Sequence, residues 1–420
     1  MASLENNNCR VCEAGDLQRF FDLGKHPLAN SLLDSADQKE ERYPLALTWC
    51  PNCSLVQLNY TVDPKVLFTH YVWVTGTSKG ARDFSEQFYK ELVARTENPK
   101  EGYVLEVASN DGTFLLPFQR DGYEVLGVDP AANVVDMANE AGVPTRCLFW
   151  NSENALKLKT EKGPARMIFA RNVLPHVANT QDFVEGLAEA LEPGGVLAIE
   201  AHYARIILKE LHYDSIYHEH LCYFTFKSLE FLLNKFGLFV FDVVQSPISG
   251  GSIVMYAQKQ KLKETDAVVY YRDREMAERI NEYSTWEQFV ARSMEHRKKF
   301  TDLLTGYVDA GKILVGWGAS ARSSTMLNFC GIDSRLLPAI IDMNPLKQGK
   351  LTAGSRIPIV GPEEGLARNP DTIVLTGWNF ADEIMKIARE KFGFRGDFLK
   401  PLPVEPKFIS RASLKSWEGE

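Results

Sequence analysis

The chain has 420 residues, a length typical of roughly two to three domains, and 45% hydrophobic and 24% charged residues, as in an ordinary soluble globular protein. The net charge of −8 at pH 7 argues against a nucleic-acid-binding surface, which needs clustered Lys and Arg. No apolar run reaches the ~18 residues of a transmembrane helix, and the opening segment MASLENNNCRVCEAG has no apolar signal region, so we expect a cytoplasmic protein.

Four of the seven cysteines form two C-x₂-C pairs in the first part of the chain. In Cys9-Arg-Val-Cys12 and Cys50-Pro-Asn-Cys53, the spacing lets two thiolates from one tight turn bind a single Zn²⁺. The two pairs predict a closed, structural Cys₄ zinc site, although the 37 residues between them exceed the usual ~15–20. The other three cysteines are predicted to be core or incidental residues: Cys147, Cys222 and Cys330.

Near residue 100 the pattern becomes that of a doubly wound α/β domain. The segment GYVLEVASNDGTFLLPFQRDGYEVLGVDP predicts a strand over 103–107, a turn over 108–112, a helix, and a second strand over 124–128 followed by Asp129. An acidic residue at that point can accept hydrogen bonds from both ribose hydroxyls of an adenosine ligand. Its distance of 23 residues from Glu106 is close to the expected ~20.

The turn between these strands indicates which ligand binds. A dinucleotide site needs G-x-G-x-x-G, so that a pyrophosphate can approach the backbone. The turn ASNDG has a single glycine and a carboxylate, which repels phosphate but suits a cationic, amino-acid-bearing ligand such as S-adenosylmethionine. The predicted cofactor-binding residues are Ala108, Asn110, Asp111, Asp129 and, in RNVLPHV, Asn172.

The rest of this region continues the α/β pattern. RMIFARNVLPHV predicts a buried strand and a helix, and FVEGLAEALEPGGVLAIEA predicts an amphipathic helix, a Pro-Gly-Gly turn and another buried strand. FVFDVVQSPISGGSIVMYAQK predicts a hairpin. A parallel sheet that ends in an antiparallel hairpin is typical of a class I methyltransferase, with another Rossmann-like domain as the alternative.

The segment DSIYHEHLCYFT follows the LAIEA strand and places Tyr217, His218, Glu219 and His220 side by side. Ligands of open α/β sheets bind at the carboxyl ends of the strands, so this segment is well placed to cover the reacting methyl group. Two histidines at i and i+2 without a nearby third ligand are a poor metal site. The segment by itself is compatible with an acid/base centre or with a structural polar cluster.

Toward the C-terminus, residues 261–310 predict one or two highly charged helices, and a second βαβ set follows. In GWGASARSS, Gly316, Gly318 and Ser320 lead into a helix N-terminus, which is suited to an anion. Arg322 and Lys347 are predicted to add positive charge for a diphosphate, with a solvated surface as the alternative interpretation.

Together these segments resemble the three-domain C-methyltransferases that act on nucleotide-linked 4-keto-6-deoxysugars. The resemblance covers nearly the whole chain and rests on the cysteine pairs with PLANSLL and YPLALTWCPNC, on EVASNDGTF, on YHEHLCYFT, and on GWGAS, LNFCGI, DMNPLKQG and GWNFADEI. It implies a zinc-binding domain over 1–70, a class I methyltransferase core over 71–260, and over 261–420 a helical linker and a Rossmann-like domain that helps to hold the nucleotide sugar.

The resemblance also implies ligands and site residues. The ligands are Zn²⁺, S-adenosyl-L-methionine and a nucleotide-diphosphate sugar, dTDP-linked or alternatively GDP- or CDP-linked, with no nucleic-acid or membrane partner. The catalytic residues that it implies are Tyr71, His176, Tyr217, Glu219 and His220. The sequence departs from the family pattern at Ala108 (usually Gly), Ser249 (often His), Arg322 (often Lys) and Ser323-Ser324 (often Gly-Asn).

The expected chemistry is methylation of the carbon beside a ketone. Such a reaction needs a base for the C3 proton and hydrogen-bond donors to the developing enolate. Histidine titrates near neutrality, so His220 is the predicted base, with His176 and Glu219 as competitors for that role. The alternatives are an O- or N-methyltransferase on a nucleotide sugar, or a non-catalytic nucleotide-sugar-binding module.

Overall fold

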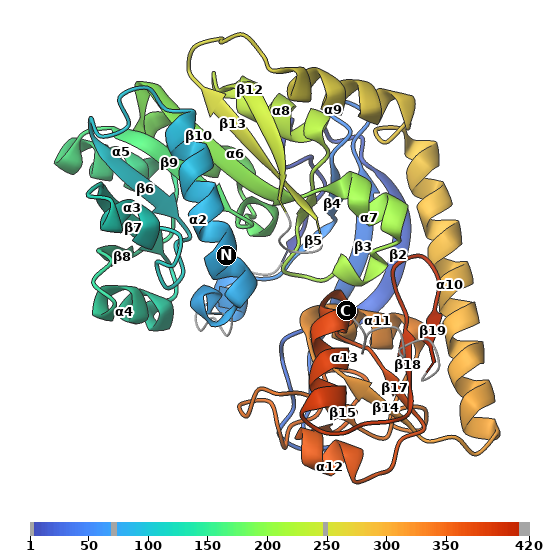
Figure 1. Cartoon of the computed structure of the whole chain (residues 1–420). Coiled ribbons are helices and arrows are strands. Elements are labelled where there is room, and N and C mark those ends of the chain that lie inside the picture. Colours follow the sequence, from blue (N-terminus) through green and yellow to red (C-terminus); the bar gives the residue numbers. More distant parts are fainter. Residues whose placement is uncertain (1–3, 69–73, 247–250, 411–420) are drawn as a thin grey trace. The chain divides into compact units, whose positions relative to one another are not determined.

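The computed structural model describes residues 4–68, 74–246 and 251–410, which form two compact units (Figure 1). The first unit takes its described residues from the ranges 1–18, 48–204 and 219–283, and the second from 19–47, 205–218 and 284–420. These units are a different division of the chain from the three predicted sequence domains, whose boundaries remain predictions. Among the described residues, no helix combines the length and the apolar character that crossing a membrane requires.

A seven-stranded sheet with the order β12-β13-β10-β9-β6-β7-β8 forms the centre of the first unit. Neighbouring strands from β10 to β8 are parallel, whereas β13 is antiparallel to both β10 and β12. The predicted strand over 103–107 and the predicted closing hairpin are confirmed. The strand bounds are β6 (Tyr103–Val107), β7 (Glu124–Asp129), β8 (Thr145–Cys147), β9 (Ala165–Arg171), β10 (Leu191–His202), β12 (Phe239–Ser246) and β13 (Ser252–Gln258).

Helices cover this sheet and bury its apolar residues. Phe88 of α2 contacts Phe114 and Phe169 edge to face, with ring centroids 5.8 and 5.0 Å away. Helices α8 and α9 pack beside β12, as Figure 1 shows. The helix bounds are α2 (Lys79–Ala94), α3 (Leu116–Arg120), α4 (Ala132–Glu140), α5 (Ser152–Lys162), α6 (Thr180–Ala190), α8 (Phe226–Lys235) and α9 (Asp266–Ala277), with the short 3-10 helices η1 (Thr75–Thr77) and η2 (Leu174–His176).

The predicted Pro-Gly-Gly turn before the LAIEA strand is instead an irregularity within β10. Leu191 pairs with Ala165, and regular pairing resumes between Val196 and Met167. Gly194 adopts a φ of 81°, a left-handed conformation that glycine accepts without strain. The strand therefore continues through the loop-forming residues because the ladder to β9 exists on both sides of them.

The N-terminal residues of the first unit form small strands, one of which pairs with a strand from later in the chain. Strand β4 pairs antiparallel with β11, with Gln57 opposite Cys222 and Val56 opposite Tyr223. The elements are β1 (Leu4–Glu5), β4 (Val56–Leu58), β5 (Tyr60–Thr61), α1 (Pro64–Phe68) and β11 (Cys222–Tyr223).

The second unit contains a six-stranded sheet with the order β16-β15-β14-β17-β18-β19. Its strands are parallel except for β19, so the predicted second βαβ set is confirmed. The strands are β14 (Leu314–Trp317), β15 (Ile340–Ile341), β16 (Ile359–Val360), β17 (Thr372–Val374), β18 (Asp397–Lys400) and β19 (Lys407–Ile409), with β2 (Gln18–Pro27) and β3 (Arg42–Trp49) outside this sheet.

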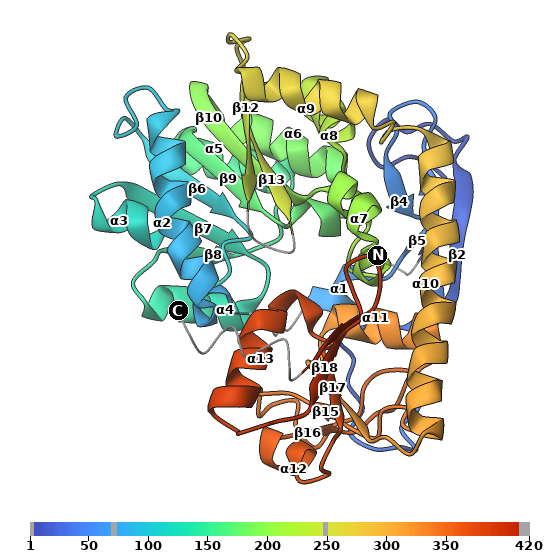
Figure 2. The same ribbon diagram turned by 45° about the vertical axis from the view of Figure 1, so that its right-hand side comes forward.

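Helices α11, α12 and α13 of the second unit lie around that sheet (Figure 2). Residues Ala381, Ile384 and Ala388 of α13 pack into the core formed by the strands. The long helix α10 and helix α11 both contact Phe21 of β2, through Phe289 and Phe329. The bounds are α7 (Ala204–Glu210), η3 (Tyr213–Ser215), α10 (Tyr283–Asp309), α11 (Ala321–Cys330), α12 (Pro362–Leu366), η5 (Trp378–Phe380) and α13 (Ala381–Glu390).

Buried polar contacts in the second unit hold the segment that leads to Tyr217. The Asp214 carboxylate, 1% exposed, accepts hydrogen bonds from Nε (3.0 Å) and Nη2 (2.9 Å) of Arg322 and from Nε1 of Trp378 (2.7 Å). The buried ring of His218 contacts the carbonyl oxygens of Tyr43 and Pro44 through Nε2, at 3.3 and 3.2 Å. These contacts fit a structural role for His218.

We expect His218 to make the protein sensitive to acid. Burial lowers the pKa of its imidazole from 6.5 to about 4, so below pH 6.5 the unfolded chain binds a proton more readily than the folded one. Stability should fall as the pH decreases from about 6.5 toward about 4. In calorimetry, the wild-type thermal midpoint should fall more steeply across this window than that of His218→Asn, and equal slopes would contradict the assignment.

Candidate zinc centre and active site

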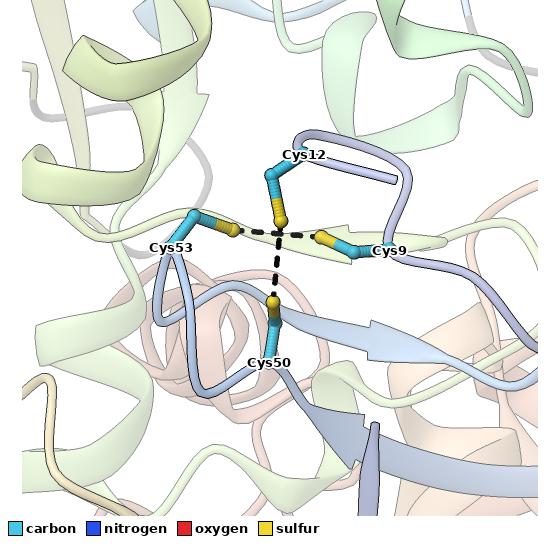
Figure 3. A group of neighbouring side chains, drawn as sticks. All are labelled: Cys9, Cys12, Cys50 and Cys53. Carbon is cyan, nitrogen blue, oxygen red and sulfur yellow. Dashed lines mark hydrogen bonds between the residues drawn. The ribbon is translucent and has the colours of Figure 1, made fainter. Parts of the chain in front are cut away.

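The four N-terminal cysteines converge on one point, as Figure 3 shows. Their sulfur atoms all lie within 4.8 Å of one another, and the Sγ atoms of the Cys9–Cys53 and Cys12–Cys50 pairs are 3.4 Å apart. A tetrahedral zinc site with Zn–S bonds of ~2.3 Å places its sulfurs about 3.8 Å apart, so the arrangement suits Zn²⁺. The spacing of the two C-x₂-C pairs had predicted this gathering.

The close approach of the sulfurs and their burial perturb the pKa values of Cys9, Cys50 and Cys53. The hydrogen bond from the Cys53 thiol lowers the pKa of Cys9 to about 5, and the same contact raises the pKa of Cys53. Burial raises the pKa of Cys50 to about 12. A divalent cation would hold all four sulfurs as thiolates, which is the donor set of a closed structural zinc site.

Arg10, between the first two cysteines, fastens the zinc turns to the rest of the first unit. Its backbone N–H donates to the Gln57 side chain (2.8 Å), and its guanidinium donates to the Leu58 carbonyl (2.6 Å) and the Thr61 hydroxyl (2.7 Å). Its own carbonyl accepts from the Thr180 hydroxyl (2.5 Å) at the start of α6. The first zinc turn is therefore bonded directly to helix α6, in the part of the same unit that contains the seven-stranded sheet.

The turn after β6 and the end of β7 form the candidate cofactor site. Asp129, the last residue of β7, accepts hydrogen bonds from the backbone N–H groups of Asn110 and Ala131, both at 2.9 Å. Burial raises the pKa of this carboxyl, and the two N–H donors oppose that shift. A carboxylate oxygen offers about two acceptor positions, so Asp129 retains capacity for ribose hydroxyls.

Asn110 and Asp111 connect this turn to the segment before α2. The Asn110 side-chain oxygen accepts from the N–H of Thr75 (2.9 Å), and Asp111 accepts from the N–H of Gly76 (2.7 Å). A Cβ at Gly76 would lie 2.5 Å from an Asp111 oxygen, so the close approach requires glycine. The side chains of both predicted residues thus fix the 3-10 helix η1 beside the turn.

Two other predicted cofactor residues have unusual backbone conformations. Ala108 has a φ of 61°, and Asn172, which follows β9, has a φ of 50°. Alanine at such a φ costs roughly 1–2 kcal/mol, which explains why glycine suits the Ala108 position. The Asn172 side-chain oxygen accepts from the Ser252 hydroxyl at 3.3 Å.

Glu106, in β6, was not predicted as a site residue. It is 3% exposed, and burial raises its pKa well above the ordinary range, with Asp111 and Asp129 adding to that shift. This environment favours the neutral form of the Glu106 carboxyl group over the carboxylate. The signal in the sequence was an acidic residue just before the turn, in LEVASNDG.

Three histidines of the first unit lie close together. The ring of His220 is 4.9 Å from that of His176 and 6.5 Å from that of His202, measured between centroids. His176, in η2, contacts the Glu219 carbonyl through Nδ1 at 2.8 Å, and burial lowers its pKa to about 4. His202, the last residue of β10, was missed in the sequence, where only its place at the end of a buried strand marks it.

For the other predicted catalytic residues, Tyr71, Tyr217 and Glu219, the structure gives less information. Tyr71 lies outside the described residues. Glu219 is 8% exposed and uses its carbonyl to hold His176, and Tyr217 is half-buried. The chain passes from the second unit to the first between His218 and Glu219.

The three predicted substrate-binding residues lie around the start of α11. Ser320 caps this helix by accepting from the N–H of Ser323 (3.2 Å). Lys347 donates to the carbonyl of Ala319 (2.7 Å). Arg322 is paired with Asp214, so part of the charge expected to serve a diphosphate is already neutralised.

Three family models match successive parts of the chain. They are described as "Putative zinc binding domain" (residues 9–68), "Methyltransferase domain" (81–243) and "C-methyltransferase C-terminal domain" (247–403). The C-methyltransferase NovU of Streptomyces niveus is 33% identical over 411 residues, which cover 97% of this chain and 98% of that protein. The ubiquinone biosynthesis O-methyltransferase of a Chelativorans species is 30% identical over 110 residues, 25% of this chain and 42% of that protein.

Solved structures also resemble part of the chain. Magnesium protoporphyrin IX methyltransferase from Synechocystis has 14% identity and a TM-score of 0.33, with coverage of 43% of this chain and 80% of that one. The CcbJ methyltransferase from Streptomyces caelestis has 16% identity and a TM-score of 0.33, with coverage of 42% and 89%.

The sheet order, the cofactor turn and the clustered cysteines define a class I S-adenosylmethionine-dependent methyltransferase with an N-terminal zinc-binding domain. More narrowly, the full-length match and the C-terminal model show that the chain belongs to the C-methyltransferase family. It is accordingly an S-adenosylmethionine-dependent C-methyltransferase.

Removal of one zinc ligand should lower both metal content and stability. We expect wild-type protein to contain one zinc per chain and Cys50→Ser to lose it and to become unstable, because metal binding and folding of small metal sites are coupled. Elemental analysis with a thermal melt measures both. Cys147→Ser, which changes an exposed cysteine, is the control, and unaltered zinc content in Cys50→Ser would refute the site.

Asp129→Asn should weaken S-adenosylmethionine binding by roughly 10–100-fold, because it removes charge-assisted hydrogen bonds to the ribose. Isothermal titration calorimetry measures the affinity directly. Asp136→Asn, which alters an exposed carboxylate on α4, should bind the cofactor as the wild type does. Equal affinity in the Asp129 and Asp136 variants would exclude the predicted ribose contact.

Proposed function

We propose that this C-methyltransferase acts on C3 of a nucleotide-linked 4-keto-6-deoxysugar, in the biosynthesis of a branched deoxysugar. The substrate class is supported by the resemblance of the zinc, cofactor, YHEH and C-terminal segments to enzymes of that kind. The proposed chemistry is supported mainly by the contact between the rings of His220 and His176. These two adjacent imidazoles have different environments, since the His176 ring bonds to the Glu219 carbonyl and His220 is half-buried.

A carbon nucleophile requires a base, and the environments of the histidines favour His220. His176 has its Nδ1 bonded to the Glu219 carbonyl, and its pKa near 4 makes it a weak proton acceptor. His220 is half-buried and lies against that ring. In the proposed mechanism the His220 imidazole takes the C3 proton, and His176 supports it as a neutral neighbour.

The remaining residues of the proposed site stabilise charge and orient groups. Removal of the C3 proton moves negative charge onto the C4 oxygen, where hydroxyl or imidazole donors lower the barrier. Tyr217 and Tyr71 are the proposed donors, and Glu219 orients an imidazole or a sugar hydroxyl. Bound S-adenosylmethionine would supply an electrophilic methyl group on its sulfonium.

The candidate sites also suggest how the cofactor and the sugar substrate would be bound. Asp129 and the Ala108–Gly112 turn would fix the adenosine part of the cofactor. Ser320 and Lys347 would help to bind the nucleotide part of the sugar substrate. Alignment of C3 with the methyl group then requires no covalent intermediate on the protein.

The product test uses ¹³C-methyl-labelled S-adenosylmethionine with a panel of dTDP-, GDP- and CDP-linked 4-keto-6-deoxysugars. We expect a product whose labelled methyl group is bonded to C3, as read by mass spectrometry and NMR. A label on oxygen or nitrogen, or no transfer to any member of the panel, would reject the proposed substrate and mechanism.

His220→Asn should lower turnover by roughly 10²–10⁴-fold, because a general base has been removed, while cofactor and nucleotide affinities stay near wild type. We expect the wild type to exchange the C3 hydrogen in deuterated water, and this exchange should disappear in the variant. His202→Asn and His176→Asn are the comparisons. If His220→Asn stays within about threefold of wild type while one of the others loses exchange, that other histidine is the base.

A further inference from the structure

The two sheets of the chain repeat the same strand order. In the first unit β8, β7, β6, β9 and β10 are successive neighbours, and in the second unit β16, β15, β14, β17 and β18 are. In both sheets the first strand in chain order, β6 or β14, lies between the second and the fourth, so the chain reverses direction across the sheet at the same place. Open α/β sheets bind ligands at the carboxyl ends of the strands at this switch point.

An aspartate lies at the carboxyl end of the second strand of both sheets, and it has equivalent backbone partners. Asp129 is the last residue of β7, and Asp342 directly follows β15. Asp129 accepts from the N–H of Asn110, in the turn after β6, and from the N–H two residues beyond itself, both at 2.9 Å. Asp342 accepts from the N–H of Ala319, in the turn after β14 (2.8 Å), and from the N–H of Asn344, two residues beyond (2.9 Å). Asp342 therefore has the same hydrogen-bonding geometry as Asp129, which is the geometry that suits a carboxylate to bind a ribose.

The Asp342 carboxylate also has capacity for a ligand. Its two oxygens each accept one backbone N–H, and a carboxylate offers about four acceptor positions in total. The side chain is 13% exposed, so it is reachable from solvent, and the Lys347 ammonium lies 3.6 Å from one of its oxygens. A sugar hydroxyl is a neutral donor that can use the remaining positions without displacing either N–H.

Two features next to Asp342 match the other parts of a nucleotide. The ten-residue helix α11 begins in the adjoining turn, and a helix N-terminus attracts phosphate. Met343 and Leu346, in the loop after Asp342, are 42% and 81% exposed, and Leu346 is the most exposed large apolar side chain among the described residues. An apolar surface next to a hydroxyl acceptor suits the base and furanose of a nucleoside.

We propose that Asp342 binds the furanose 3′-hydroxyl of the nucleoside diphosphate carried by the substrate. This inference rests on the proposed function for the identity of the ligand, and it adds a residue that the sequence prediction of Ser320, Arg322 and Lys347 did not include. In the second unit, Asp342 would bind the nucleoside of the substrate in the way that Asp129 of the first unit is proposed to bind the adenosine of the cofactor.

The experiment measures affinity for matched nucleotides by isothermal titration calorimetry, with full-length zinc-loaded protein saturated with S-adenosylhomocysteine. A first panel of dTDP, GDP, CDP and UDP identifies the nucleotide that binds. That nucleotide is then compared with its 3′-deoxy analogue. The wild type should bind the 3′-deoxy analogue about tenfold or more weakly, since a hydrogen bond to a carboxylate is lost.

The variant Asp342→Asn should bind the parent nucleotide about tenfold more weakly and should no longer distinguish it from the 3′-deoxy analogue. The control Asp333→Asn alters a carboxylate that pairs with exposed Arg335 in the same unit, and it should keep the wild-type discrimination. A variant that discriminates as the wild type does would overturn the assignment of Asp342.

The wild-type comparison tests the inference even if Asp342→Asn does not fold, because equal affinity for the parent and the 3′-deoxy nucleotide would already overturn it. Failure of all four nucleoside diphosphates to bind would instead reject the nucleotide-sugar substrate, and with it the inference. Binding of one of them without 3′-hydroxyl discrimination would reject the role of Asp342 alone.

Discussion

The antiparallel pairing of β4 with β11 is the contact on which the placement of the candidate active site in the first unit depends. Strand β4 begins three residues after Cys53, and β11 begins two residues after His220. The Leu58 N–H donates to the Leu221 carbonyl, and the Leu221 N–H donates to the Pro175 carbonyl, next to His176. The zinc turns, residues 219–221 and η2 therefore belong to one hydrogen-bonded series within the first unit, and this series leads from the cysteines to the neighbouring imidazoles of His176 and His220.

Most of the fold and part of the candidate site could be predicted from the sequence, because they depend on short-range patterns. Two C-x₂-C turns can be recognised because each places two thiolates within a few residues, and the structure brings all four sulfurs together. The strand over 103–107 and the acidic end of the next strand could be predicted because buried parallel strands are continuous apolar runs. The position of Asp129 was predicted in this way, since it depends only on where its strand ends.

Contacts between distant segments could not be predicted. Arg322 appeared available to a phosphate because nothing in its own segment indicates the ion pair with Asp214, 108 residues earlier. His202 has no neighbouring residue that marks it, and its relation to His220 exists only once β10 and the YHEH segment are folded. Asp342 had the same sequence signal as Asp129, but its strand β15 is two residues long, too short for periodicity to establish its end.

The burial of the segment before His220 limits how its residues can be dissected genetically. From Leu211 to Glu219 all side chains except that of Tyr217 are buried, and those of Tyr213 and Asp214 bond to the buried side chains of His296 and Trp378. Substitutions across this stretch will impair accumulation of folded protein and activity together, so a mutational scan scored by growth or yield would mark the whole stretch as essential. Within residues 211–220, the half-buried Tyr217 and His220 are the positions where a defect in the proposed chemistry can be separated from a defect in folding.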